Sequence, residues 1–176
     1  QNTVVGESII DLEVPWEKAL VADDPYESIV GKSITGIRRR AKYIIIDLDQ
    51  GALLVHLRMT GKLTPVAPEK HVTVMLHFET GNTLYFQDTR KFGRMEYVNN
   101  PMEKLAHLGP EPLADDFTPE VFYKMLRSKN RQIKPLLLDQ TFLAGLGNIY
   151  VDEALFQAGI QPLSIAASIP KRQSMS

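Results

Sequence analysis

The chain contains no cysteine and no long run of apolar residues. Without cysteine it can form neither a disulfide framework nor a thiolate metal site, and this composition suits the reducing interior of a cell. Its apolar runs, such as residues 43–46, are far shorter than the roughly 20 residues that cross a bilayer. The N-terminus also lacks the basic and then apolar pattern of a secretion signal. We therefore expect a cytoplasmic protein that does not associate with membranes.

An excess of charge of one sign is also missing. The sequence has 20 Lys and Arg residues against 21 Asp and Glu residues, which gives a net charge of −1 at pH 7. This balance provides no bulk attraction for a polyanion, so any binding of nucleic acid has to come from local basic patches. Residues 127–134 form one such patch, with four cations and no acid.

Residues 33–98 show the pattern of antiparallel β-structure. Short runs rich in β-branched and aromatic residues alternate with turn residues, and no insert is long enough for a connecting helix. Residues 49–51 and 79–82 are typical of hairpin turns. We predict a β-sandwich or barrel with strands over residues 34–40, 43–48, 53–57, 72–78, 83–86 and 93–98.

From about residue 100 the pattern becomes helical. Asn100 and Thr118 each precede a proline, and a capping side chain followed by proline is a typical helix start. Further helices are predicted over residues 133–138 and 149–158, whereas the polar tail from Ala166 is expected to fray.

The fold class predicted from these patterns is α+β. The change from strand to helix falls near residues 99–113. At 176 residues the chain is long enough for one or two globular domains. We predict a β-sandwich domain over residues 1–105 and a helical domain over residues 106–176.

The segment over residues 140–159 combines a glycine-containing turn, an asparagine and an amphipathic helix. Asn148 is predicted to cap the helix, while Gly145 and Gly147 permit positive φ or a close approach of the backbone to a ligand. The N–H groups of the first helical turn would then form an anion site. A capped helix beside a basic segment is also common in proteins that bind no phosphate, so both interpretations stay open on this pattern.

Four motifs occur in order along the chain: Arg-Arg-Arg-Ala-Lys-Tyr at residues 38–43, His-Leu-Arg-Met-Thr-Gly at 56–61, Asp-Thr-Arg-Lys-Phe-Gly at 88–93, and Leu-Leu-Leu-Asp-Gln at 136–140 leading into Gly-Asn-Ile-Tyr at 147–150. Together they resemble the bacterial formamidopyrimidine-DNA glycosylases. These base-excision repair enzymes remove oxidised purines from duplex DNA and then cleave the strand at the abasic site. The first and third motifs favour this purine-directed branch over the related endonuclease VIII branch.

The resemblance implies a β-sandwich followed by a helix–two-turn–helix module, with DNA in the cleft between them. Family members begin with Pro-Glu-Leu-Pro-Glu-Val-Glu on a helix and end with a four-cysteine zinc finger. This sequence begins Gln-Asn-Thr-Val and has no cysteine, so we expect a chain truncated at both ends. The proline nucleophile, its neighbouring glutamate and the family's zinc would all be absent. We therefore expect no cofactor and no metal ligands in this chain, a monomeric state, and damaged double-stranded DNA as the partner.

Lys42 is the one catalytic residue that the resemblance transfers to this chain. The matching lysine of the family approaches the damaged nucleotide and supports base excision. Without the motif, a lysine that follows three arginines between two strands is as readily a solvated charge that discourages strand aggregation.

Met59, Arg90 and Phe92 match the family residues that enter the duplex when the damaged base is extruded. Flipping a base costs a few kcal/mol, so a wedge and a cation that satisfies the orphaned base offset part of the cost. Met59 and Phe92 are residue types that usually pack in a core, but both have glycine and charged neighbours in predicted hairpin tips. The resemblance also implies DNA contacts for His56, His71, Arg90, Lys129, Asn130, Arg131, Lys134 and Asn148.

Three functions stay open on the sequence. The first is a repair glycosylase and lyase whose terminal pieces are missing here, and the second is a catalytically inert remnant that binds DNA. The third is a nucleic-acid-binding module without a repair role, since helix–two-turn–helix units also occur in ribosomal and topoisomerase proteins. The motifs of the β-structure count against the third, because a helical module has no need of Lys42, Met59 or Phe92.

We expect the 176-residue chain to release no oxidised purine and to form no adduct that borohydride traps, because the family's amine nucleophile has no counterpart in it. Incubation with a duplex that contains an oxidised guanine, followed by denaturing electrophoresis, measures both reactions. A covalent complex trapped at neutral pH would contradict this expectation and would point to Lys42 or the terminal amine as the nucleophile.

Overall fold

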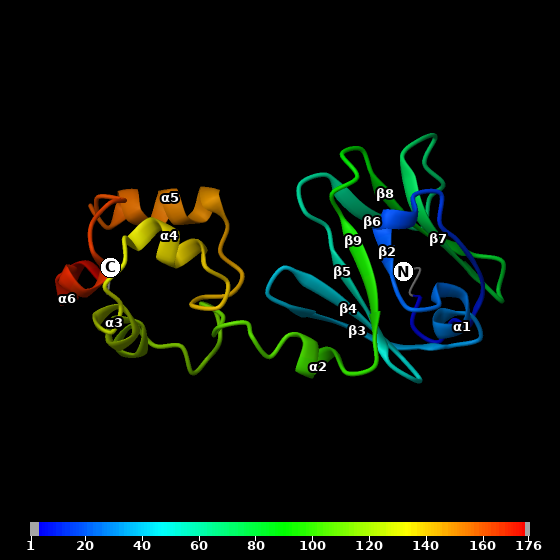
Figure 1. The fold of residues 1–176 in the computed structure, drawn as a ribbon, viewed down its shortest axis with the longest axis horizontal. Coiled ribbons are helices and arrows are strands. Elements are labelled where there is room, and N and C mark those ends of the chain that lie inside the picture. The colour runs from blue at the N-terminus through cyan, green and yellow to red at the C-terminus, as the bar shows by residue number, and fades with distance from the viewer. Residues whose placement is uncertain (1–3, 175–176) are drawn as a thin grey trace. The chain divides into compact units, whose positions relative to one another are not determined.

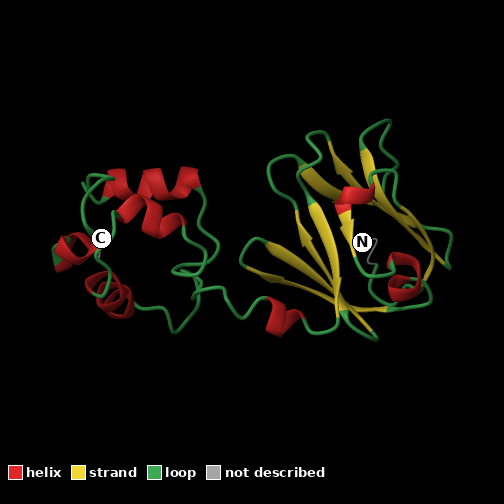
Figure 2. Ribbon diagram, viewed as in Figure 1, coloured by secondary structure: helices red, strands yellow, loops and turns green. Residues whose placement is uncertain are grey.

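The computed structural model describes residues 4–174, which fall into two compact units with bounds Gln1–Ala106 and His107–Ser176. Figure 1 shows that the first unit contains the strands, and Figure 2 shows the helices of the second unit in red. The elements of the first unit are β1 (Ile9–Glu13), η1 (Glu17–Ala19), β2 (Leu20–Val21), α1 (Pro25–Ile29), β3 (Ile34–Arg40), β4 (Tyr43–Leu48), β5 (Ala52–His56), β6 (Gly61–Thr64), β7 (Val72–Phe78), β8 (Thr83–Asp88), β9 (Arg94–Val98) and α2 (Pro101–Lys104).

The strands of the first unit form a sandwich of two sheets. One sheet has the order β1-β7-β8-β6, and the other has the order β2-β9-β5-β4-β3. Alternate residues of the facing strands meet in one core, in which Ile46, Leu53 and Phe86 are almost fully buried. Full burial of an aromatic side chain contributes about 1.5–3 kcal/mol. The predicted α+β class is confirmed, although β2 pairs with β9 in parallel rather than antiparallel orientation.

Most of the predicted strands are confirmed. The ranges of β3, β4 and β7 coincide with the predictions, while β5 begins one residue earlier and β8 extends to Asp88. The turn at residues 49–51 joins β4 to β5, and Gly51 takes the positive φ of 74° that the turn requires. β1, β2, β6 and α1 were not predicted. β2 and β6 span too few residues to show a pattern, and a register shift between Ile9 and Asp11 interrupts the alternation in β1.

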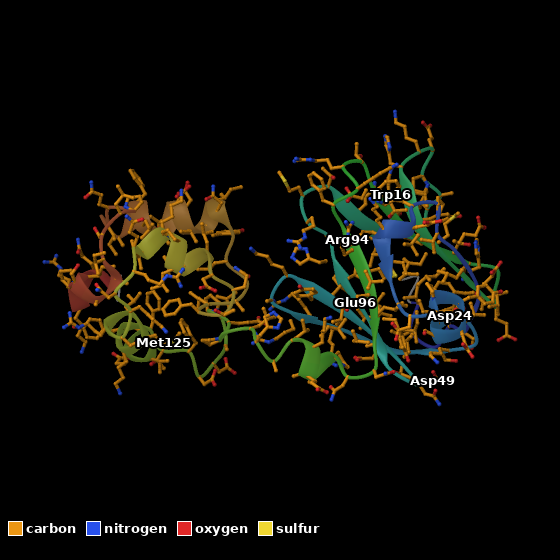
Figure 3. The ribbon with its side chains drawn as sticks, viewed as in Figure 1. Trp16, Asp24, Asp49, Arg94, Glu96 and Met125 are labelled. Carbon is orange, nitrogen blue, oxygen red and sulfur yellow. The ribbon has the colours of Figure 1, made fainter. Side chains whose placement is uncertain are left out.

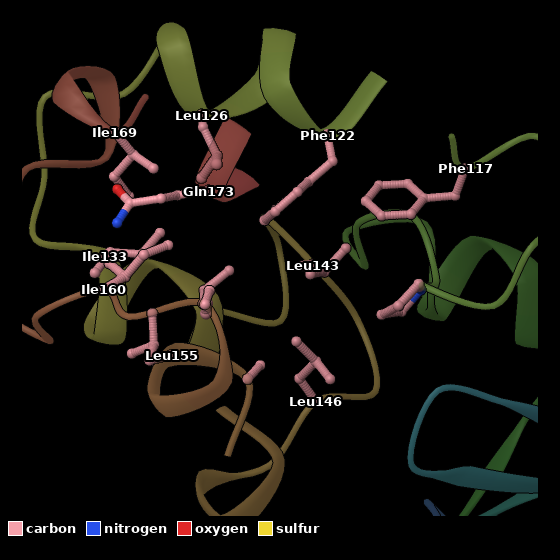
Figure 4. Close-up of a pocket in the computed structure, with 14 residues that line it drawn as sticks. Phe117, Phe122, Leu126, Ile133, Leu143, Leu146, Leu155, Ile160, Ile169 and Gln173 are labelled. Atoms are coloured by element: carbon pink, nitrogen blue, oxygen red, sulfur yellow. The ribbon is translucent and has the colours of Figure 1, made fainter. Parts of the chain in front are cut away.

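The second unit is helical. The predicted start of α3 is confirmed, because the Thr118 side chain accepts a hydrogen bond from the N–H of Val121. The predicted start of α2 in the first unit is also confirmed, because the Asn100 side chain accepts hydrogen bonds from the N–H groups of Met102 and Glu103. The core between these helices includes a pocket of about 260 Å³ whose lining is apolar apart from Gln173 (Figure 4). The elements are α3 (Pro119–Arg127), α4 (Ile133–Leu138), α5 (Asn148–Gln157), η2 (Ala166–Ser168) and α6 (Lys171–Ser174).

Two predictions for the second unit are wrong. Gly147, not Asn148, is the N-cap residue of α5, and its φ of −118° and ψ of 173° are extended. Asn148 is the first residue of the helix, and no side chain caps this helix start. The tail is also not frayed through residue 173, because Ala166 and Ile169 are buried in the helical core. These two apolar residues lie among serines, so their three-residue spacing did not indicate a buried face. Met175 and Ser176 lie outside the described residues.

Candidate functional site

Basic side chains gather at one end of the five-stranded sheet. Lys42 lies in the turn between β3 and β4, and His56 ends β5. The pairing of the strands places Tyr43 opposite His56 and His56 opposite Arg94. The rings of Tyr43 and His56 meet edge to face at a centroid distance of 5.0 Å. Arg58, which follows β5, completes the group.

The charges of this group affect one another. Burial lowers the pKa of His56 below its ordinary value, and the positive charges of Arg58 and Lys42 lower it further. Burial and then Arg58 also lower the pKa of Lys42. His56 Nδ1 accepts a hydrogen bond from the backbone N–H of Arg58 at 3.0 Å, so the neutral ring carries its proton on Nε2. The group therefore presents a positive field that favours an anion.

Met59, Arg90 and Phe92 form a second group, which we call the wedge cluster. Arg90 Nη1 lies 2.9 Å from Met59 Sδ, and the guanidinium carbon lies 4.8 Å from the centroid of the Phe92 ring. Met59 is 73% exposed and Phe92 is 51% exposed, so neither belongs to the core. The structure thus brings together three residues that the sequence places up to 33 positions apart.

The prediction that the wedge residues occupy hairpin tips is wrong. Met59 lies between β5 and β6, and Arg90 and Phe92 lie between β8 and β9. Each pair of strands belongs to two different sheets, so both loops pass from one sheet of the sandwich to the other. The residues of these loops resemble those of a hairpin turn, which led to the wrong prediction. Whether a loop joins two strands of one sheet or of two sheets depends on how the core packs, not on the loop residues.

Asp88 holds these two loops together. Its carboxylate is 1% exposed and accepts hydrogen bonds from the Thr60 hydroxyl, from Arg90 N–H at 3.1 Å and from Gly93 N–H at 2.6 Å. Burial raises the pKa of Asp88, but hydrogen bonds from Thr60 and from the amides of Gly93, Arg90 and Phe92 outweigh it and leave the pKa lowered. A Cβ on Gly93 would lie 3.1 Å from this carboxylate and 2.5 Å from the Phe86 ring, so the approach requires glycine.

His71 is connected to the same strand end. Its carbonyl accepts a hydrogen bond from Asp88 N–H at 2.9 Å, and its φ of 65° lies in the left-handed region. Ala41, Arg58 and Lys91 also have positive φ, and they directly precede Lys42, Met59 and Phe92. Left-handed conformations cost non-glycine residues roughly 1–2 kcal/mol each. Their concentration beside predicted site residues is typical of strain held at a functional site.

In the second unit, Lys129 and Arg131 line a pocket of about 350 Å³ together with Asp139 and Thr141. Arg131 Nη1 pairs with Asp139 Oδ2 at 2.9 Å. Hydrogen bonds from the Thr141 hydroxyl, from Arg131 and from the Thr141 amide lower the pKa of Asp139 to about 2. Asn130 between the two cations is exposed. The predicted phosphate ligand Arg131 is thus partly neutralised by a carboxylate.

Asn148 begins α5, and Lys134 lies beside the first turn of this helix. Lys134 Nζ pairs with Asp152 Oδ1 at 2.6 Å, one turn into the helix. The preceding loop is organised by Gln140, whose Nε2 donates to the carbonyls of Leu138 and Leu146 and whose Oε1 accepts from Gly145 N–H, each at 3.0 Å. Gln140 ends the motif at residues 136–140, but the motif does not predict this role.

Arg58, Asp88, Gln140 and Asp139 were not predicted as site residues. All four occur within the motifs, so their position there is the signal that could have identified them. Among the described residues, no three His, Cys, Asp or Glu side chains gather in a way that could hold a metal ion. The sequence has no cysteine, so these residues cannot form the four-cysteine zinc site that the family resemblance implies. In residues 4–174 no helix is both long and apolar enough to span a bilayer.

Both units of the chain match protein-family models. Residues 1–95 match the formamidopyrimidine-DNA glycosylase N-terminal domain, and residues 108–176 match the formamidopyrimidine-DNA glycosylase H2TH domain. The chain is 45% identical to the formamidopyrimidine-DNA glycosylase of Protochlamydia amoebophila over 96% of this chain and 64% of that protein. It is 42% identical to that of Herpetosiphon aurantiacus over 96% of this chain and 66% of that protein. The chain thus spans about two thirds of the length of these relatives.

Solved structures give the same result. The enzyme of Lactococcus lactis bound to DNA with an abasic site matches with a TM-score of 0.86 and 35% identity over 97% of this chain and 69% of that chain. The same enzyme in complex with DNA containing Fapy-dG matches with a TM-score of 0.85 and 35% identity over 97% of this chain and 68% of that chain.

Replacing Asp88 with Asn should destabilise the first unit by about 1.5–3 kcal/mol, because a buried charged acceptor of several N–H and O–H groups is lost. Denaturant unfolding followed by circular dichroism measures the change. Asp49→Asn, at an exposed turn, is the control and should stay within about 0.5 kcal/mol of the parent. Because the pKa of Asp88 is lowered from 3.8, its contribution is present above that pH and is lost as the pH falls further. Equal stability of both variants would contradict the assigned role.

Replacing His56 with Asn should make the first unit less sensitive to acid. The pKa of His56 is lowered from 6.5, so the unfolded chain takes up the proton at a higher pH than the folded chain. Stability therefore falls as the pH drops through 6.5, and Asn removes that loss while its Oδ1, bonded to Cγ like the Nδ1 of histidine, can still accept the Arg58 N–H bond. Urea unfolding at steps between about pH 7 and pH 5 gives the slope of the free energy of unfolding against pH for the variant and the parent. A variant with the same slope as the parent would contradict the burial of a neutral His56.

Proposed function

Because this chain belongs to the formamidopyrimidine-DNA glycosylase family, we propose that its function is in base excision repair on duplex DNA with oxidised purines or abasic sites. The proposed reaction of the family is removal of the oxidised base, followed by cleavage of the strand at the abasic site. We propose that these 176 residues supply the DNA binding and base extrusion for that reaction, whereas its amine nucleophile has no counterpart in them. The proposal needs no cofactor within these residues. We propose that the protein acts as a monomer in the cytoplasm, on the DNA of the nucleoid.

The wedge cluster is the observation that supports this proposal most directly. An extruded base leaves a gap in the stack and an orphaned partner base. Met59 and Phe92 are exposed apolar side chains that can fill such a gap. Arg90 contacts both of them and carries several N–H donors for the orphaned base. Two large apolar side chains from separate loops that meet one cation at the surface are the arrangement that such a wedge requires.

Lys42 is proposed to approach the damaged nucleotide. Its ammonium group lies in the positive field that includes Arg58 and His56, which favours contact with the sugar-phosphate strand. Because its pKa is lowered, Lys42 gives up a proton more readily than an ordinary lysine and is the better proton donor to a departing base. His56 and His71 are proposed to contact the backbone on either side of it.

The helical unit is proposed to bind phosphates without reading sequence. Arg131 and Lys134 already pair with Asp139 and Asp152, which reduces their attraction for DNA. We propose that Lys129 and the N–H groups at the start of α5, beside Asn148, make the stronger contacts. This arrangement sets affinity and register on any sequence, which suits a protein that searches for rare lesions.

The proposal is tested by binding of the 176-residue chain to duplexes with and without a tetrahydrofuran abasic analogue. We expect tighter binding to the lesion duplex, and we expect the double variant Met59→Ala, Phe92→Ala to lose about tenfold on that duplex and little on the intact one. A tenfold loss corresponds to about 1.4 kcal/mol of the flipping cost. Fluorescence anisotropy gives both dissociation constants.

Ile10→Ala serves as the matched control, because Ile10 is 53% exposed on edge strand β1 and belongs to neither group. It should leave both dissociation constants unchanged. If the double variant Met59→Ala, Phe92→Ala lost equal affinity for the two duplexes, the assignment of these residues as a wedge would be wrong. Failure of the parent chain to bind either duplex would contradict the proposed DNA binding by these residues.

A further inference from the structure

We propose that Arg58 and Arg94 form a phosphate-binding pair beside the wedge cluster. The pair would bind a phosphodiester group of the DNA, as a site additional to the contacts expected at Lys42, His56 and His71. This inference rests on the proposed function, because the phosphate is taken to belong to the duplex that Met59 and Phe92 enter.

The two arginines share one pocket. It has a volume of about 460 Å³ and is lined by Arg58, Met59, Phe92 and Arg94. Arg94 is the first residue of β9 and lies opposite His56, while Arg58 follows His56 by two positions. Figure 3 labels Arg94 on β9. The two arginines thus border a pocket whose other lining residues are Met59 and Phe92 of the wedge cluster.

The guanidinium of Arg94 is held in place by the backbone. Its Nη1 donates to the carbonyl of Gly93 at 2.9 Å and to that of Lys91 at 3.3 Å. Both carbonyls belong to the loop that carries Phe92. Because a guanidinium has five N–H donors, several remain for a ligand after these bonds. Arg94 is therefore oriented by its own loop before any ligand binds.

The charge of the pocket is not balanced by nearby carboxylates. Asp88 lies beneath the loops and accepts bonds from Thr60 and loop amides, and Glu96 pairs with Lys104 at 2.5 Å. Within residues 4–174 no ion pair joins Arg58 or Arg94 to an acid. Like charges that gather without a counter-charge repel one another, and an anion relieves that repulsion.

Arg58 has a backbone conformation that is unfavourable for its residue type. Its φ of 55° is left-handed, a region that glycine enters without steric cost. A long cation at such a position is a solvated surface charge in the simplest interpretation. That interpretation predicts that glycine at position 58 improves stability and changes nothing else. The phosphate interpretation predicts that the same change improves stability but weakens DNA binding.

The experiment measures binding of the chain to the duplex with the tetrahydrofuran analogue across a series of KCl concentrations. The variants are Arg58→Gly, Arg94→Gln and their combination. Each single variant should lower the slope of log affinity against log salt by about one unit and weaken binding several-fold. Arg58→Gly should melt at or above the temperature of the parent, which separates the loss of binding from unfolding.

Lys32→Gln is the matched control. Lys32 precedes β3 and lies over the ring of Tyr97, near the turn at residues 49–51 and thus at the opposite end of the sheet from Arg94 (Figure 3). This variant should keep the salt slope of the parent. If the parent binds DNA and neither Arg58→Gly nor Arg94→Gln changes the slope, the phosphate pair is wrong while the proposed function stands. If the parent binds no DNA, the proposed function fails and this inference fails with it.

Discussion

The carboxylate of Asp88 joins two loops that would otherwise be independent. One loop leaves β5 and carries Thr60, and the other leaves β8 and carries Arg90 and Gly93; the carboxylate accepts bonds from all three. A buried carboxylate is costly unless its acceptors are satisfied, so the bonds that stabilise the charge also fix the loops. The contact of Arg90 with Met59 follows from this arrangement.

The same end of the sandwich collects strained backbone and positive charge. Four non-glycine residues with positive φ lie at or directly before predicted site residues. The charge of Arg58 lowers the pKa of Lys42 and of His56, and Lys42 also lowers that of His56. Both features oppose stability in the free protein, and both suit a surface that becomes complementary only when a polyanion binds. The helical unit shows the contrasting solution, in which Asp139 and Asp152 partly neutralise its cations.

Much of the fold could be predicted because strand alternation and helix starts depend on neighbouring residues. The ranges of β3, β4, β7 and α4 coincide with the predictions, and Asn100 and Thr118 cap their helices as expected. Asn148 was assigned the wrong role because a cap position depends on the backbone angles of Gly147, which the sequence does not reveal. Arg58 was missed because its importance comes from neighbours on other strands.

By itself, the sequence determined which residue types stand in each motif, most of the longer strands and helices, and that no thiolate site can form. Only the tertiary structure decided that Thr60 meets Asp88 across 28 positions and that Arg90 meets Met59 across 31. Those contacts require two loops to cross between the same pair of packed sheets. Their geometry is set by the shared core, which no local pattern encodes.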